Sequence, residues 1–224
     1  MIWAANWKMN LKPQEGIDFL QNFVESQDSS IQENTWIFPQ NYSIGAIYKI
    51  LSNTEIKWGA QNISDKNDGA LTGENSASIL KDLGATTCLV GHSERRNLFN
   101  EDNELLSSKI AYAQSVDLCP LYCIGEHLED REASNTESVL TEQLKTGLSK
   151  LDSSKAFAIA YEPVWAIGTG QVASLEQVIE AHAFIRKTLQ EMYSEEVAQR
   201  CPILYGGSVK PENAKDLSTG ENVD

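Results

Sequence analysis

Seven short apolar segments, each followed by a longer stretch with helical periodicity, constrain the fold of this chain most strongly. The stretches between the segments carry apolar residues three and four positions apart, as at Ile17, Leu20 and Val24. Strands that are apolar on both faces are typical of a parallel sheet covered by helices. The predicted strands are Ile2–Lys8, Thr35–Pro39, Ile56–Gln61, Thr87–Val90, Leu118–Ile124, Ala156–Tyr161 and Pro202–Tyr205.

This alternation of strand and helix is compatible with an open doubly wound sheet or with a (β/α) barrel, and in both folds ligands bind at the carboxyl ends of the strands. Two helix starts are also predicted. Pro13 stands at the first turn of one helix, and Ser174, followed three residues later by Gln177, caps another. Since no Pro-, Gly- or Ser-rich linker divides the sequence, we expect one domain over residues 1–224.

The charge balance excludes several classes of partner. The chain has 18 Lys and Arg against 32 Asp and Glu, a net charge of -14, which disfavours nucleic acid and acidic membranes. There is neither a basic start followed by an apolar stretch nor an apolar run of about 18 residues, so we expect a soluble, cytoplasmic protein. Without ligand spacing among the three histidines, no metal site is expected. The cysteines form no C-x-x-C pair and are expected to be reduced: Cys88, Cys119, Cys123 and Cys201.

Polar residues follow four of the predicted strands at the edge where ligands bind. Asn6 and Lys8 stand at the end of the first, "GHSERR" (91–96) after the fourth, "YEPVWAIGTG" (161–170) at the end of the sixth and "YGGSV" (205–209) at the end of the seventh. Each has an ordinary explanation, because a lone Lys is usually a solvated charge, a lone His an interior group and a Gly-Gly a turn. Four such groups at equivalent positions favour one shared site.

Taken together, these segments resemble the triosephosphate isomerase family. The resemblance runs from Asn6 almost to the end of the sequence and is carried, in order, by "NWKMN", "GAQN", "GHSERR", "CIGE", "AYEPVWAIGTG" and "YGGSV". It implies an α/β fold of the (β/α) TIM-barrel type, with seven βα units in this sequence. It also implies an isomerase that interconverts dihydroxyacetone phosphate and glyceraldehyde 3-phosphate through an enediolate and needs no cofactor.

That reaction needs a base, an electrophile for the carbonyl oxygen and a grip on the phosphate. Glu162, beside Pro163 and among apolar residues, is the expected base, because a partly desolvated carboxylate is a better proton acceptor. His92 is the expected electrophile, kept neutral near a helix start, with a buried orienting histidine as its alternative role. Lys8 would supply positive charge for the substrate, with Asn6 beside it.

The resemblance assigns further roles around the substrate. Backbone N–H groups at Gly168, Gly207 and Ser208 would hold the phosphate. Glu94 would either pair with Lys8 or relay protons. A lid would close over the site and exclude water; it comprises Pro163, Val164, Trp165, Ala166, Ile167, Gly168, Thr169 and Gly170.

The polar segment 61–74, "QNISDKNDGALTGE", is by itself typical of a solvated loop. By resemblance it is the interdigitating loop of a homodimer, in which Thr72 reaches the Asn6 and Lys8 region of the other protomer. Arg95 would support that interface. The neighbouring Arg96 is expected to take part in an internal ion pair.

The family closes its barrel with an eighth strand and helix, and a Gly-Gly at that strand completes the phosphate site. Here Asn222–Asp224 match only the approach to the eighth strand, which leaves the first and seventh strands with unpaired edges. We expect a segment beyond Asp224, or failing that another chain, to fill the gap. The alternative function is a folded barrel relative with weak or no catalysis that serves in binding or assembly. A different phosphate-binding barrel enzyme is more remote.

Overall fold

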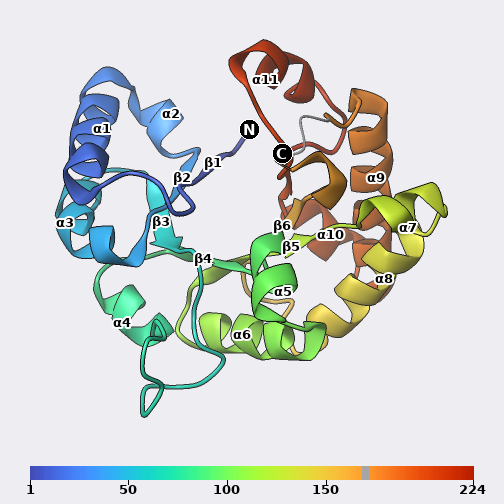
Figure 1. Ribbon diagram of the computed structural model, residues 1–224, viewed down its shortest axis with the longest axis horizontal. Helices are drawn as coiled ribbons and strands as arrows, with labels where there is room; N and C mark the ends of the chain where they lie inside the picture. Colours follow the sequence, from blue (N-terminus) through green and yellow to red (C-terminus); the bar gives the residue numbers. More distant parts are fainter. Residues whose placement is uncertain (168–171) are drawn as a thin grey trace.

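The computed structural model describes residues 1–167 and 172–224, and seven parallel strands form its centre (Figure 1). Their order in the sheet follows the sequence from first to last, without the reversal that an open doubly wound sheet has at its switch point. The curled sheet ringed by helices is therefore a TIM barrel. The strands are β1 (Trp3–Asn6), β2 (Thr35–Phe38), β3 (Lys57–Ala60), β4 (Thr87–Val90), β5 (Cys119–Ile124), β6 (Ala158–Tyr161) and β7 (Ile203–Tyr205).

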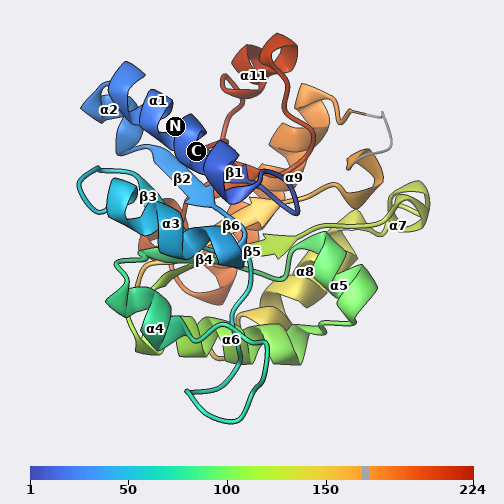
Figure 2. The same ribbon diagram turned by 60° about the vertical axis from the view of Figure 1, so that its left-hand side comes forward.

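Helices cover the outside of the sheet, and the segment between the third strand and the next helix projects away from the body (Figure 2). The two predicted helix starts are confirmed: α1 begins at Pro13, and Ser174 and Gln177 form a capping box at the start of α9. The helices described are α1 (Pro13–Ser26), α2 (Ser29–Gln32), α3 (Asn41–Leu51), α4 (Ala77–Asp82), α5 (Ser93–Phe99), α6 (Asn103–Ser115), α7 (Leu128–Glu132), α8 (Thr136–Gly147), η1 (Val164–Ala166), α9 (Leu175–Met192), α10 (Glu195–Arg200) and α11 (Pro211–Leu217).

Side chains of the strands divide between two apolar clusters. Neighbouring residues point to opposite faces, so Ile37 packs in the large cluster beneath the helices while Phe38 packs in the small cluster inside the barrel. Val90 and Leu89 of β4 divide in the same way. Because both faces of the sheet are buried, the strands read as continuous apolar runs in the sequence.

Asp224 lies in the opening between β1 and β7 and bonds to both sides of it. Its amide donates to the carbonyl of Ile203 at 3.0 Å, and its own carbonyl accepts from the amide of Ile2 at 2.6 Å. The side chain of Arg186 on α9 pairs with the Asp224 carboxylate and so helps to hold the bridge. The expectation that both edges are unpaired is therefore corrected at Ile2 and Ile203, which bond to Asp224. Within the described residues, β1 and β7 do not pair with each other directly.

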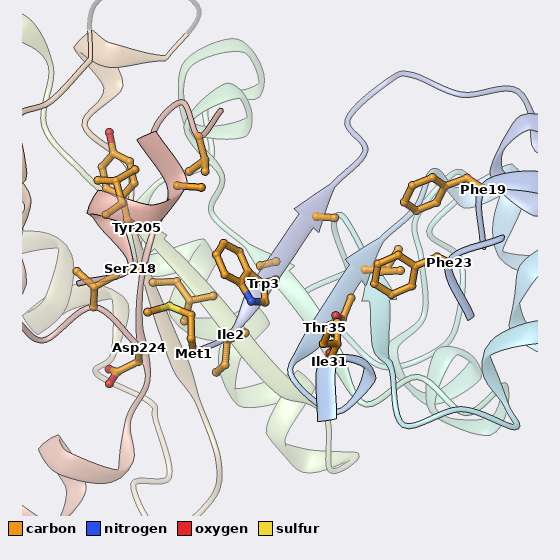
Figure 3. Close-up of a pocket in the computed structure, with 18 residues that line it drawn as sticks. Met1, Ile2, Trp3, Phe19, Phe23, Ile31, Thr35, Tyr205, Ser218 and Asp224 are labelled. Atoms are coloured by element: carbon orange, nitrogen blue, oxygen red, sulfur yellow. Dashed lines mark hydrogen bonds between the residues drawn. The ribbon is translucent and has the colours of Figure 1, made fainter. Parts of the chain in front are cut away.

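An apolar groove of about 490 Å³ opens beside this bridge (Figure 3). Trp3 stands in it between Phe19 and Phe23 of α1 on one side and Tyr205 on the other. Trp3 and Phe19 each keep 46 % of their surface exposed.

Candidate active site

The carboxyl ends of β1, β4, β6 and β7 surround one cavity of about 510 Å³. The four groups of strand-end residues that were predicted to share a site all contribute to its wall. Apolar side chains close its floor toward the barrel interior, while its rim is polar. The lining includes Asn6, Lys8, His92, Glu94, Glu162, Ile167, Gly206, Gly207 and Ser208.

Glu162 follows β6 directly and is only 4 % exposed. Its Oε2 accepts a hydrogen bond from the amide of Ser93 at 2.9 Å, and its Oε1 lies 3.3 Å from Nε2 of His92. The amide of Ser93 belongs to the first turn of α5, where backbone N–H groups are free to bind an anion. The carboxylate and the imidazole are thereby held side by side in the cavity.

His92 precedes α5 as its N-cap residue, and this position determines which ring nitrogen carries the proton. Nδ1 accepts a hydrogen bond from the amide of Glu94 at 3.2 Å. In the neutral ring the proton must then lie on Nε2, the nitrogen that faces Glu162. The ring can therefore offer an N–H donor to an oxygen bound in the cavity.

Lys8 has a left-handed backbone, with φ of 49°, which residues other than glycine seldom adopt. Its amide donates to Oδ1 of Asn6 at 2.9 Å. Its ammonium pairs with Oε1 of Glu94 at 2.7 Å. Two roles were considered for Glu94, and the structure shows the ion pair with Lys8. This pair keeps the ammonium of Lys8 at the rim of the cavity.

Glu126 anchors the first part of the predicted lid, a role that was not predicted from the sequence. Its fully buried carboxylate accepts from Nε1 of Trp165 at 2.9 Å and from the hydroxyl of Tyr161 at 3.0 Å. Arg131 pairs with it at 3.2 Å. A signal was present in "CIGE", because Glu126 closely follows β5 much as Glu162 follows β6.

The described part of the lid ends at Ile167. Within it, the carbonyl of Ala166 accepts a hydrogen bond from Oγ of Ser208 at 3.2 Å, which links the lid to the loop after β7. Gly168, Thr169 and Gly170 lie outside the described residues, and so does the phosphate contact expected of Gly168.

The segment 61–74 is mostly exposed, Thr72 included. Its Asp68 carboxylate accepts hydrogen bonds from the hydroxyls of Ser76 and Ser78, which tie the segment to the start of α4. These bonds lower the pKa of Asp68 below its usual value, so the carboxylate stays charged over a wider pH range.

The two neighbouring arginines differ in the partners that their guanidinium groups bind. Arg95, expected at an interface, pairs with Oε1 of the buried Glu101 at 2.7 Å. The expected ion pair of Arg96 is wrong: within the described residues its guanidinium donates to neutral oxygens of Gly91, Asn103 and Tyr122. Arg96 therefore ties the start of α5 to β5 through neutral oxygens.

All four cysteines are free, and burial raises the pKa of the Cys123 thiol well above its usual value, with the charge of Glu162 raising it further. Among the residues described, no group of three or more His, Cys, Asp or Glu side chains could hold a metal ion. In the same part of the chain, no helix has the length and apolarity needed to cross a membrane.

The fold and the site together define a TIM-barrel protein whose cavity at the strand ends brings a carboxylate, an imidazole and an ammonium group together. Comparison with known proteins identifies the family: the family model described as "Triosephosphate isomerase" matches residues 1–224, and the chain belongs to that family. The resemblance found in the sequence is confirmed.

Relatives named "Triosephosphate isomerase" match almost the whole chain. The protein of Chlamydia trachomatis serovar D is 47% identical over 98% of this chain and 80% of its own length. That of Bdellovibrio bacteriovorus is 47% identical over 96% of this chain and 88% of its own length. That of Rhodopirellula baltica is 43% identical over 100% of this chain and 89% of its own length.

Proposed function

We propose that this chain interconverts dihydroxyacetone phosphate and glyceraldehyde 3-phosphate through an enediolate, with its own side chains in the catalytic roles. The observation that carries the proposal is the pairing of Glu162 with His92, 3.3 Å apart, in a cavity that Lys8 also lines. Relatives named as isomerases over nearly the whole chain do not favour the alternative of a barrel without catalysis.

Glu162 is the base in this proposal. It removes a proton from the carbon next to the carbonyl group and returns it to the adjacent carbon, while the carbonyl and hydroxyl oxygens exchange roles through the enediolate. To do so, its carboxylate must exchange the contacts with His92 and the Ser93 amide for contacts with the substrate. His92 donates its Nε2 hydrogen to the oxygen on which negative charge develops, where a fixed donor is most effective.

The remaining groups bind the substrate and exclude water. Lys8 attracts an anion into a chain whose net charge is -14. The backbone at Gly207 and Ser208, which line the cavity after β7, holds the phosphate. The segment anchored through Trp165 closes over the bound enediolate, so that water cannot promote loss of its phosphate.

We further propose that the enzyme is a cytoplasmic homodimer formed through residues 61–74. Free thiols favour a reducing compartment. Exposed apolar side chains at Met9, Leu98 and Phe99, on the loop after β1 and the end of α5, support an interface with a second copy. In that dimer Thr72 of one protomer approaches the Asn6 and Lys8 region of the other.

The assignment of Glu162 can be tested by turnover in both directions with the purified chain. We expect Glu162→Gln, which keeps the shape of the side chain, to lower kcat by about 100- to 10,000-fold because only the base is lost. Glu180→Gln, at an exposed position on α9, should keep full activity. Retention of more than about a tenth of the activity by Glu162→Gln would show that another group removes the proton.

A further inference from the structure

The side-chain amide of Gln61 binds two carbonyl groups at the rim of the cavity. Gln61 directly follows β3, and its Nε2 donates to the carbonyl of Lys8 and to the carbonyl of Phe38, each at 2.9 Å. One hydrogen of the amide can therefore bind the loop after β1, through the carbonyl of Lys8, while the other binds the end of β2, through the carbonyl of Phe38. Gln61 belongs to the segment "GAQN", which has no part in the mechanism above.

The residue that Gln61 contacts is the one with the strained backbone. Lys8 has a φ of 49°, and a residue with a Cβ keeps such a conformation only where its surroundings hold it. Three side chains do so from different directions: Asn6 binds its amide, Glu94 its ammonium and Gln61 its carbonyl. The contact from Gln61 joins the loop to a strand on the far side of β2.

We propose that Gln61 is a positioning residue, which holds the backbone of Lys8 so that the ammonium meets the anionic substrate. The inference rests on the proposed function, because it requires Lys8 to act on the substrate. Without the amide, residue 8 relaxes toward an ordinary backbone conformation and its ammonium moves away from the cavity. Glu162 and His92 are held by β6 and α5, so the chemical step itself changes little.

The same contact links the substrate site to the exposed segment 61–74, of which Gln61 is the first residue. A change in the backbone of that segment reaches the cavity through the carbonyl of Lys8. This gives the segment a route to influence substrate affinity that does not depend on direct contact with the substrate.

The first test is Gln61→Met, which keeps the length of the side chain and removes both donors. We expect KM for dihydroxyacetone phosphate to rise about 10-fold, the size expected for two lost hydrogen bonds, with kcat changed less than about threefold. The matched control is Gln40→Met, because the amide of Gln40 donates to the carbonyl of Asn10 in the same loop at 3.1 Å. The control should leave KM unchanged, and an unchanged KM in Gln61→Met would overturn the proposal.

A double-mutant cycle separates positioning from a general structural role. In a Lys8→Ala background the ammonium is absent, so Gln61→Met should lower kcat/KM little further. An equal loss of kcat/KM in both backgrounds would show that Gln61 acts independently of Lys8 and would refute the inference. If Gln61→Met does not fold, Gln61→Asn, too short to reach both carbonyls, takes its place with the same expectations. A wild-type chain without isomerase activity would instead overturn the proposed function.

Discussion

At the scale of single residues, the site depends on where its hydrogens lie. The amide of Glu94 occupies Nδ1 of His92, and this one bond places the ring proton on Nε2, beside Glu162. An imidazole with the proton on the other nitrogen would present a lone pair to the substrate oxygen and could not stabilise it. In the proposed mechanism, the local turn at the start of α5 therefore sets the donor that His92 offers to the substrate.

We expect His92→Gln to lower kcat by about 100- to 1,000-fold, the range for losing one donor to a developing oxyanion, with a much smaller change in KM. The reason is that this hydrogen bond strengthens as the negative charge forms. His127→Gln is a matched control, since His127 is an exposed N-cap residue before α7. Steady-state kinetics check the result, and a loss confined to KM would indicate that His92 only binds the substrate.

Residue types and positions along the sequence were sufficient to predict that Glu162, His92 and Lys8 line one cavity. They were not sufficient for Glu126 and Gln61, because the roles of these two come from hydrogen bonds to distant segments. A polar residue at a strand end marks a candidate, but its partners depend on the neighbouring strands. The two adjacent arginines illustrate the same limit, since nothing in their sequence context distinguishes a carboxylate partner from a carbonyl.

At the scale of elements, two side chains of α9 bind Asn222 and Asp224. Arg186 pairs with Asp224, and Nδ1 of His182 lies 2.9 Å from the carbonyl of Asn222, a distance suited to donation. His182 is completely buried, and within the described residues its Nε2 has no hydrogen-bond partner. Burial lowers the pKa of His182 to about 4, because a charged ring would lie in apolar surroundings.

This burial predicts a loss of stability in acid. From about pH 6.5 down to about pH 4, the unfolded chain binds a proton at His182 that the folded chain does not, so the free energy of unfolding falls. The fall from this group is on the order of 3 kcal/mol, at about 1.4 kcal/mol for each pKa unit. His182→Gln should remove that part of the pH dependence, measured by denaturant unfolding at pH 7 and pH 4.5. The same pH dependence in both proteins would contradict the prediction.

All seven strands were predicted from apolar runs, but most are shorter than predicted. The first was expected over Ile2–Lys8 and is observed over Trp3–Asn6. Apolar character continues into the turn because Trp7 packs in the core beneath the helices. The left-handed backbone of Lys8 ends the extended conformation of the strand. That backbone depends on side-chain contacts, which cannot be predicted from the pattern of apolar residues.

At the scale of the whole molecule, the projecting segment 61–74 offers a test of the proposed dimer. We expect that replacing residues 65–74 with a short Gly-Ser connector, while keeping Gln61, yields a monomer of lower activity. The segment would cross to the other protomer, so its removal takes away contacts from both sites. Sedimentation velocity of the variant and the wild type measures the change, and an unaltered dimer would place the interface elsewhere.

Periodicity alone left two architectures possible for the whole chain, and the motifs decided between them. The reason is that an open sheet and a barrel are built from the same βα units and differ in the order of their strands. That order is set by pairing between strands that are distant in sequence, which no local pattern reports. The structure confirms the barrel because each strand pairs with the next in the chain.

The bridge at Asp224 also has a consequence for how the chain folds. Each pairing from β1–β2 to β6–β7 joins strands that are consecutive in the sequence, whereas the bond between Ile2 and Asp224 closes a loop that contains all seven strands. The entropy lost in closing a flexible loop grows with its length, and contacts distant in sequence slow folding. We expect the six pairings between consecutive strands to form first and to bring Ile2 and Asp224 close together. The junction therefore depends on the rest of the barrel, and the rate at which it forms is set by elements that do not touch it.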